Sequence, residues 1–158
     1  MNHEFQIFVS TYANTTRGEW LNPLDDDFDD RCNAISDNGR NEILAADCEG
    51  FGSLSSESVT LLAGVAQFAS RQYEPAAFVA YLAYVGGDAE DVADDFADAY
   101  AGEWDDEEAY AQHIADETLE IPASLAPYFD TEKFARDLFI SDYFSVDAPR
   151  GVYVFRHV

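Results

Sequence analysis

The sequence predicts an α+β fold, because its hydrophobic pattern changes period along the chain. Over Glu4–Thr11 apolar and polar residues alternate, which is typical of a half-buried strand. From Ser58 onward apolar residues recur every three or four positions, the period of an amphipathic helix. The last twenty residues form two apolar segments around a turn, as in an antiparallel hairpin.

A short sheet is expected in the first third of the chain. After the opening strand, Ala13–Gly18 has turn chemistry, and Glu19–Leu21 is expected to return as a second short strand. The acidic run Asp25–Asp30 can open a helix, because carboxylates are favourable at a helix N-terminus. Asn41–Cys48 is expected to form a third strand, and Gly50–Ser53 a flexible break.

The middle of the chain is expected to be helical. The apolar positions of Val59–Ala69 predict a first helix, and Pro75 is well placed to open a second one over Ala76–Val85. The glycine pair that follows ends this helix, and Asp88 is a plausible N-cap for a third helix that reaches Tyr100.

The C-terminal third is expected to combine helices with a hairpin. Asp105–Glu117 predicts a helix and Thr131–Leu138 a shorter helical segment. Phe139–Val146 and Gly151–Val158 are expected to pair as strands across the turn between them. With a second boundary near Gly102, three small domains are expected: an N-terminal β-rich domain with a short helix (residues 1–53), a central helical domain (54–101) and a C-terminal α+β domain (102–158).

The composition indicates a folded, strongly acidic protein. The 158 residues carry a formal charge of −24, yet 47% are apolar and 15% aromatic. Low hydrophobicity together with high charge would indicate disorder, but here the aromatic residues can build a core. The acid excess disfavours direct binding to nucleic acid or to an anionic membrane surface, since both require Lys and Arg.

A cytoplasmic location is expected. Met1–Val9 lacks the pattern of a signal peptide, and no run of eighteen apolar residues is present for a transmembrane helix. Cys32 and Cys48 lie sixteen positions apart and outside any CxxC motif. Two free thiols in a reducing compartment are favoured, with a disulfide between them as the alternative.

Charge segregation is the most informative feature of the sequence. Seventeen Asp and Glu residues and no Lys or Arg lie between Arg71 and Lys133. Soluble domains usually intersperse both signs, because packed like charges repel. The segregation favours a partner, and specifically a protein surface built to hold nucleic acid. The candidate partner-binding residues are Asp88, Asp91, Asp94, Asp95, Asp98, Glu103, Asp105, Asp106, Glu107, Glu108, Asp116, Glu117 and Glu120.

Four aspartates of the third expected helix share one face, because they fall at positions i, i+3, i+4 and i+7. They are Asp91, Asp94, Asp95 and Asp98. The opposite stripe is apolar and is expected to face the core. Its members are Val92, Phe96, Ala99 and Tyr100. Each like-charge pair costs about 0.2–0.5 kcal/mol, and no nearby Lys or Arg relieves it, so the helix is locally frustrated. Such frustration is typical of a functional surface.

The charge density of this region approaches that of a duplex. If residues 88–108 formed one continuous helix, their eleven acids would lie roughly 2.7 Å apart at about 1.5 Å per residue. B-DNA carries one charge per about 1.7 Å over both strands, or about 3.4 Å per strand.

Simpler explanations for the acids stay open. A charged helix face is often only solvated, and a salt-adapted protein also has many acids and few lysines. The chain has one Lys, but its high aromatic content argues against salt adaptation. A calcium loop beginning at Asp25 fails, because Asp30 and Ser36 stand where an EF-hand needs Gly and Glu.

No enzyme chemistry is indicated. The three histidines, His3, His113 and His157, show no metal-binding spacing, and His113 is expected at a surface or in a groove. Neither a GxSxG motif nor a phosphate-binding glycine loop is present. Among thirty-two acids, pairs with suitable spacing arise by chance and do not indicate an acid–base site. We therefore expect no catalytic residues, no metal and no cofactor.

Several segments match a known family. They are Tyr100–Trp104 (YAGEW), Asp105–Ile114 (DDEEAYAQHI), Ile121–Phe129 (IPASLAPYF), Phe134–Phe144 (FARDLFISDYF), and, near the start, Ile7–Tyr12 (IFVSTY) and Gly18–Leu21 (GEWL). Together they resemble the ArdA antirestriction family of conjugative plasmids and transposons. The resemblance covers residues 100–155 and 5–21, whereas residues 25–84 match poorly and look shortened.

The resemblance implies an elongated, three-domain DNA mimic that forms a homodimer through its C-terminal domain. It also implies that the acidic surface occupies the DNA-binding groove of type I restriction–modification enzymes and blocks the methyltransferase core. The charges carried over by the resemblance are Glu103, Asp105, Asp106, Glu107, Glu108, Asp116, Glu117 and Glu120. Ile121–Asp137 resembles the antirestriction motif of the family, with partner contact and dimer packing both open as its role.

The sequence therefore supports an inhibitor that competes with DNA, through charge spread over many residues. Two alternatives are an acidic inhibitor of another DNA-binding system, such as a CRISPR effector or a nucleoid protein, and a non-inhibitory acidic assembly protein. An inhibitor that copies phosphates should bind more weakly in salt and should tolerate the loss of any single carboxylate.

Overall fold

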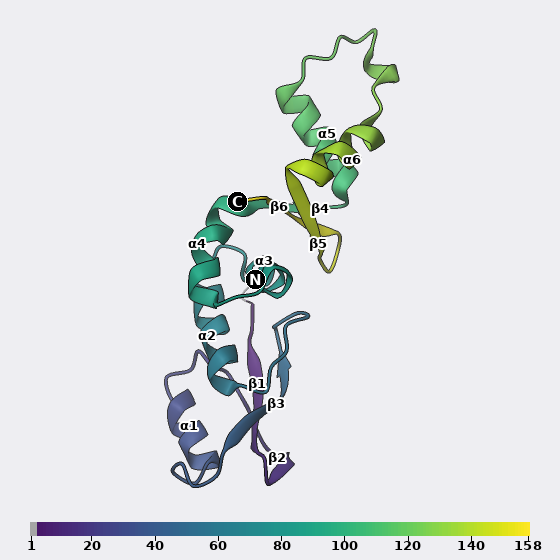
Figure 1. Cartoon of the computed structure of the whole chain (residues 1–158). Helices are drawn as coiled ribbons and strands as arrows, with labels where there is room; N and C mark the ends of the chain where they lie inside the picture. The colour runs from purple at the N-terminus through teal and green to yellow at the C-terminus, as the bar shows by residue number, and fades with distance from the viewer. Residues whose placement is uncertain (1–2) are drawn as a thin grey trace. The chain divides into compact units, whose positions relative to one another are not determined.

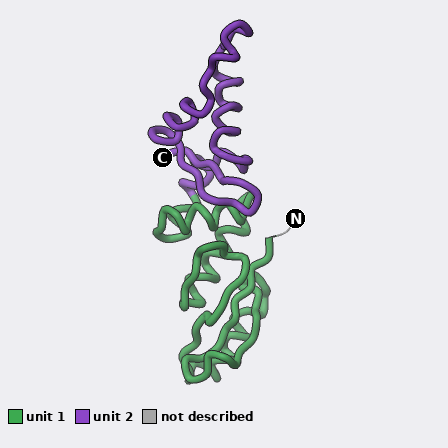
Figure 2. The backbone as a smooth tube through the Cα atoms, turned by 90° about the vertical axis from the view of Figure 1, so that its right-hand side faces the viewer, with its two compact units in different colours: residues 1–93 green, residues 94–158 purple. Residues whose placement is uncertain are grey.

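The computed structural model describes residues 3–158 and has the predicted α+β class, with helices packed on antiparallel sheets (Figure 1). Met1 and Asn2, which begin the segment tested above for a signal peptide, lie outside the described residues. The chain separates into two compact units, unit 1 up to Ala93 and unit 2 over 94–158 (Figure 2). The three-domain division remains a prediction.

Both units contain strands and helices. Unit 1 contains β1 (Gln6–Thr11), β2 (Asn14–Leu21), α1 (Phe28–Ile35), β3 (Ile43–Glu49), α2 (Val59–Ser70) and α3 (Pro75–Val85). Helix α4 (Ala89–Ala99) contains the division between the units. Unit 2 contains β4 (Tyr100–Trp104), α5 (Glu107–Thr118), the 3-10 helix η1 (Ala126–Tyr128), α6 (Thr131–Ser141), β5 (Tyr143–Asp147) and β6 (Val152–Arg156).

The sheet of unit 1 has β1 at its centre, in the antiparallel order β2-β1-β3. Phe5, Ile7 and Val9 are completely buried, as their alternation predicted. Helices α1 and α2 contact this sheet, and α3 packs on α2 (Figure 1). Phe51 and Phe78 are also buried in unit 1, and burying each such side chain stabilises the fold by about 1.5–3 kcal/mol.

The second strand is longer than predicted. Residues Asn14–Gly18, assigned to a turn from the sequence, belong to β2, and only Tyr12 and Ala13 form the hairpin turn. The β-branched pair Thr15 and Thr16 favours a strand, and pairing with β1 overrides the turn chemistry around it.

The helices of unit 1 begin where the sequence placed them. The Ser58 hydroxyl caps α2 by accepting a hydrogen bond from the Leu61 amide at 3.2 Å. Pro75 occupies the first turn of α3, where its missing amide costs no hydrogen bond. At the end of α3, Gly86 has a φ of +74°, which glycine adopts without strain.

The sheet of unit 2 is built around β6, in the antiparallel order β4-β6-β5. Phe155 on β6 is fully buried, and its ring lies 6.1 Å from Phe96 of α4, 5.6 Å from Tyr100 and 5.3 Å from Phe144. Helices α5 and α6 pack on each other, and their connection forms an open loop at the end of α5 away from the sheet (Figure 1).

Two elements of unit 2 differ from the prediction. Tyr100–Trp104 forms β4, although its sequence has no β-branched residue and Gly102 was taken as a boundary. The strand exists because it pairs with β6, fifty residues later in the chain, and Gly102 adopts a φ of +107° within it. Phe139–Ser141, predicted to begin a strand, instead extends α6, and β5 begins at Tyr143. Packing of α6 on α5 outweighs the strand preference of aromatic and β-branched residues there.

Candidate functional site

Helix α4 presents the aspartate face that its spacing predicted. Asp91, Asp94, Asp95 and Asp98 are all exposed. Their apolar counterparts Val92, Phe96 and Ala99 are buried, at 7%, 3% and 0% exposure. The helix starts at the predicted place, since the Asp88 carbonyl accepts the Val92 amide at 3.0 Å.

The carboxylates of this region are not neutralised within the chain. Among residues 3–158, no ion pair involves an acid between Asp88 and Glu108. The four aspartates of α4 make two i,i+3 and two i,i+4 like-charge pairs, each unfavourable by about 0.2–0.5 kcal/mol. The chain therefore keeps a strained, solvent-facing set of negative charges.

The acids from Asp88 to Glu108 do not lie on one continuous helix. Helix α4 ends at Ala99, β4 follows, and α5 starts at Glu107. The comparison of a single acidic helix with a duplex is therefore wrong in its geometry, because β4 pairs with β6 and interrupts the helix. Glu103 is exposed on β4, so the negative surface passes from helix to strand to helix.

Two acids at the start of α5 also hold the fold. The Asp106 carboxylate caps the helix by accepting the Ala109 amide at 2.7 Å. The Ser145 hydroxyl of β5 donates to Glu107 at 2.7 Å and fixes that carboxylate against the sheet. Asp105 and Glu108 are exposed beside them. These contacts orient the acids, so their positions are set before any partner arrives.

The acids at the end of α5 have nearby partners on the same helix. Gln112 donates to Asp116 at 2.9 Å, and Glu117 lies 3.3 Å from the His113 ring. The His113 ring is half-buried against Trp104, with ring centroids 4.8 Å apart, so it is a packing residue at the surface. Glu120 is exposed just beyond the helix.

A buried aromatic cluster packs against the inner face of α5, the helix that carries these acids. Tyr110 is 3% exposed, and its ring lies 5.2 Å from Trp104 and 5.1 Å from Tyr143. Burial, together with the hydrogen bond to Tyr143, raises the pKa of Tyr110 well above its ordinary value. The phenol therefore stays neutral at physiological pH.

The segment Ile121–Asp137 is mostly solvent-exposed. Leu125 and Tyr128 are 56% and 83% exposed, although both are apolar or aromatic. Asp130 caps α6 by accepting the Lys133 amide at 3.0 Å. Two large exposed side chains favour a contact role over a core role.

One acid of this surface was absent from the predicted set. Glu90 is exposed in the first turn of α4, one position before Asp91. The spacing of three and four residues used to define the aspartate face starts from Asp91, and Glu90 does not lie at one of these spacings from it. A count of exposed acids per turn would have found it.

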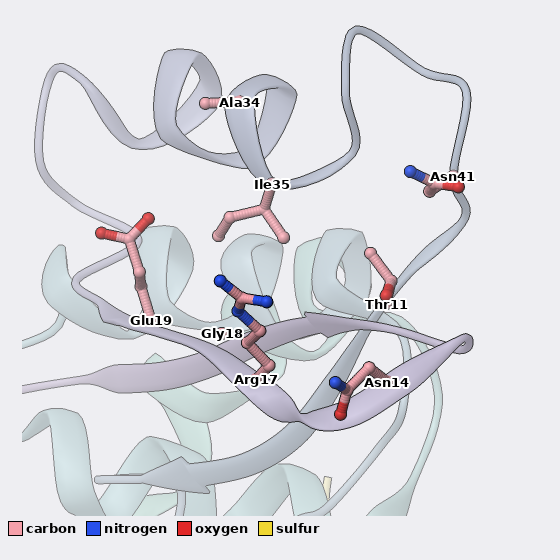
Figure 3. A pocket seen from close by; sticks show the side chains of 8 residues that line it. All are labelled: Thr11, Asn14, Arg17, Gly18, Glu19, Ala34, Ile35 and Asn41. Carbon is pink, nitrogen blue, oxygen red and sulfur yellow. The ribbon is translucent and has the colours of Figure 1, made fainter.

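Unit 1 also contains a polar hollow. The pocket of about 410 Å³ between β2 and α1 is lined by Arg17, Glu19 and Asn41 among others (Figure 3). Its lining contains no Ser, Cys or His. In residues 3–158 no group of three or more His, Cys, Asp or Glu is arranged to hold a metal ion. Over the same residues, the helices are too short or too polar to cross a membrane.

Comparison with known proteins gives one finding. A sequence search among curated proteins gives no match. A family model described as "Antirestriction protein (ArdA)" matches residues 9–152, and so includes the middle of the chain where the motifs alone match poorly. Because that match covers most of the chain, the protein belongs to the ArdA family of antirestriction proteins.

Proposed function

We propose that this protein inhibits type I restriction–modification enzymes by occupying the groove in which they hold DNA. The observation that carries the proposal is the exposed acidic surface of α4, β4 and the start of α5, which has no ion pair within the described chain. A cationic groove would neutralise these charges. Relief of the repulsion between the carboxylates would then contribute favourably to the binding free energy. The protein acts as a binding inhibitor and not as an enzyme.

Preorganisation supports the affinity of such an inhibitor. The α4 aspartates are fixed on a helix whose other face is buried, and Asp106 and Glu107 are held by hydrogen bonds. Little conformational entropy is therefore lost on docking. Condensed counterions are released from both surfaces, as happens when the enzyme binds DNA itself.

Sequence-independent recognition follows from the same chemistry. Carboxylates can stand in for phosphates, but they do not reproduce the donor and acceptor pattern of base edges. The inhibitor should therefore act on several type I enzymes that read different sequences.

In the cytoplasm, where these enzymes work, a homodimer joined through unit 2 would present two such surfaces, each chain bringing a charge of −24. Sedimentation equilibrium at micromolar concentration tests this, and a monomer there would contradict the dimer.

The proposal is tested by measuring how the protein blocks DNA cleavage by a purified type I enzyme. The test variant is Asp91/Asp94/Asp95/Asp98→Asn, which removes four charges from α4. The matched control is Asp25/Asp26/Asp29/Asp30→Asn, which removes four exposed charges from the loop before α1 and its first turn. We expect the α4 variant to lose inhibition by tenfold or more and the control to stay close to wild type.

Four outcomes would contradict the proposal. Equal loss in both variants would show that net charge alone matters, and no loss in either would show that the acids of α4 do not contact the enzyme. A complete loss from Asp94→Lys alone would contradict a distributed surface. Inhibition of an unrelated DNA-binding protein, with none of the type I enzyme, would favour another defence or nucleoid target.

A further inference from the structure

Unit 1 contains an apolar groove beside the first turn of α4. Its volume is about 410 Å³, in the range of ligand pockets, which is about 300–1,000 Å³. It is lined by Leu61, Val65 and Phe68 of α2, by Leu82 of α3 and by Ala89 of α4. The acidic surface described above does not account for this groove.

The groove is open because small residues border it. An added Cβ at Gly64 of α2 would meet nothing within 4 Å. Gly86 and Gly87 line the groove with backbone alone, at φ values of +74° and +94°. Leu61 is 48% exposed, although a leucine on a helix that packs against a sheet is usually covered. The chain thus leaves apolar surface uncovered where a single larger residue would close it.

The rim of the groove is acidic where it meets α4. Asp88 and Glu90 line it, and Asp91 follows in the same helical turn. Arg71 lies at the other end of α2, stacked on the Phe68 ring at 5.2 Å. From there to Lys133 the sequence contains no Lys or Arg. The apolar groove is therefore continuous with the start of the acidic surface.

We infer that the groove receives an apolar side chain, such as Leu, Met or Phe, that projects from the DNA-binding surface of the inhibited enzyme between Lys or Arg residues. This inference rests on the proposed function and adds a contact that DNA cannot make. Charge complementarity selects this occupant, because the acidic rim formed by Asp88 and Glu90 repels an anionic lipid surface and any acidic segment placed in the groove. It attracts an apolar residue with cationic neighbours.

The inference predicts two separable parts of the binding free energy. The acidic surface contributes a part that falls linearly with the logarithm of salt concentration, with a slope set by the number of charges neutralised. The groove contributes a part that salt does not weaken, because burial of apolar surface releases no counterions. A plot of log Kd against log salt therefore reports the two parts as its slope and its offset.

The test measures Kd for a purified type I methyltransferase core over a range of salt concentrations. Leu61→Gln makes the lining of the groove polar, and Gly64→Leu places a larger side chain at its border; neither changes a charge. Gly64→Ala is the matched control at the same position, and Leu24→Gln replaces an exposed leucine that does not line the groove. Thermal unfolding checks that each variant is folded. If Gly64→Leu does not fold, the Kd of Leu61→Gln tests the inference.

We expect both groove variants to raise Kd about tenfold or more at every salt concentration, with an unchanged slope, and both controls to bind as wild type. Wild-type binding that competes with DNA, together with unaltered Kd in the groove variants, would overturn the inference and leave the proposed function standing. Absence of wild-type binding would overturn both. A change of oligomeric state in the groove variants, with unaltered Kd, would assign the groove to a second copy and overturn the inference.

Discussion

Neutralising part of the α4 face should make the protein more stable while it weakens inhibition. The triple variant Asp94/Asp95/Asp98→Asn removes all four like-charge pairs of this face, since each pair contains one of these residues. It keeps Asp91, which lies in the first turn and is favourable there through the helix dipole. Asn and Asp have nearly equal helix propensity, so the substitution mainly removes charge.

The magnitude follows from the four pairs. At about 0.2–0.5 kcal/mol each, their removal should raise the free energy of unfolding by about 0.8–2 kcal/mol at low salt. Loss of a carboxylate next to the C-terminus of α4, at Asp98, should add about 0.3–1 kcal/mol. The gain should shrink at 1 M salt, where the screening length falls to about 3 Å.

Urea denaturation at 20 mM and 1 M NaCl measures the gain. In a Trp20→Phe background, Trp104 fluorescence follows unit 2, which contains the three substituted residues, and in a Trp104→Phe background Trp20 fluorescence follows unit 1 as a reference. A triple variant that is less stable than wild type at low salt would refute the reasoning. It would show that the aspartates make favourable interactions, for example with bound cations, and are not held in mutual repulsion.

Three further predictions concern the scaffold that holds the surface. Asp106→Ala should cost about 0.5–2 kcal/mol of unfolding free energy in urea titrations, because α5 loses its N-cap, and a neutral result would contradict that role. Burial raises the pKa of the Cys32 thiol to about 11 and also raises the pKa of Cys48, so both thiols should react slowly with an alkylating reagent at pH 8. Mass spectrometry should show that the more exposed Cys48 is alkylated before Cys32, and the reverse order would contradict the packing. Gly18→Ala should destabilise unit 1 by about 1–3 kcal/mol in thermal unfolding, because its methyl group would overlap the backbone carbonyl of Val9, and an unchanged melting temperature would refute the strand geometry.

Periodic segments of this fold could be predicted from the sequence. The buried side of β1, the starts of α2 and α3 and the apolar stripe of α4 all follow from local patterns whose physical cause is local. The aspartate face of α4 follows for the same reason, because residue spacing on a helix fixes which side chains share a face. Its exposure is the consequence of burying Val92 and Phe96 on the other side.

Elements that depend on distant partners could not be predicted in this way. Strand β4 carries Gly102 and no β-branched residue, and only its pairing with β6 makes it a strand. That pairing also interrupts the acidic stretch of residues 88–108. The positions of the acids in the sequence could therefore be predicted, but the division of this stretch into helix, strand and helix could not. The apolar groove beside Ala89 has no sequence signature, because its walls come from three helices. The packing of α2 against α3 creates it.

The central claim is that this acidic surface and DNA compete for one groove. The most direct measurement titrates labelled wild-type protein against a purified type I methyltransferase core at several fixed concentrations of duplex that contains the recognition site. The account predicts that the apparent Kd rises in proportion to duplex concentration without a plateau, and that no ternary complex forms. An apparent Kd that does not change with duplex concentration, or a stable complex of all three components, would contradict it.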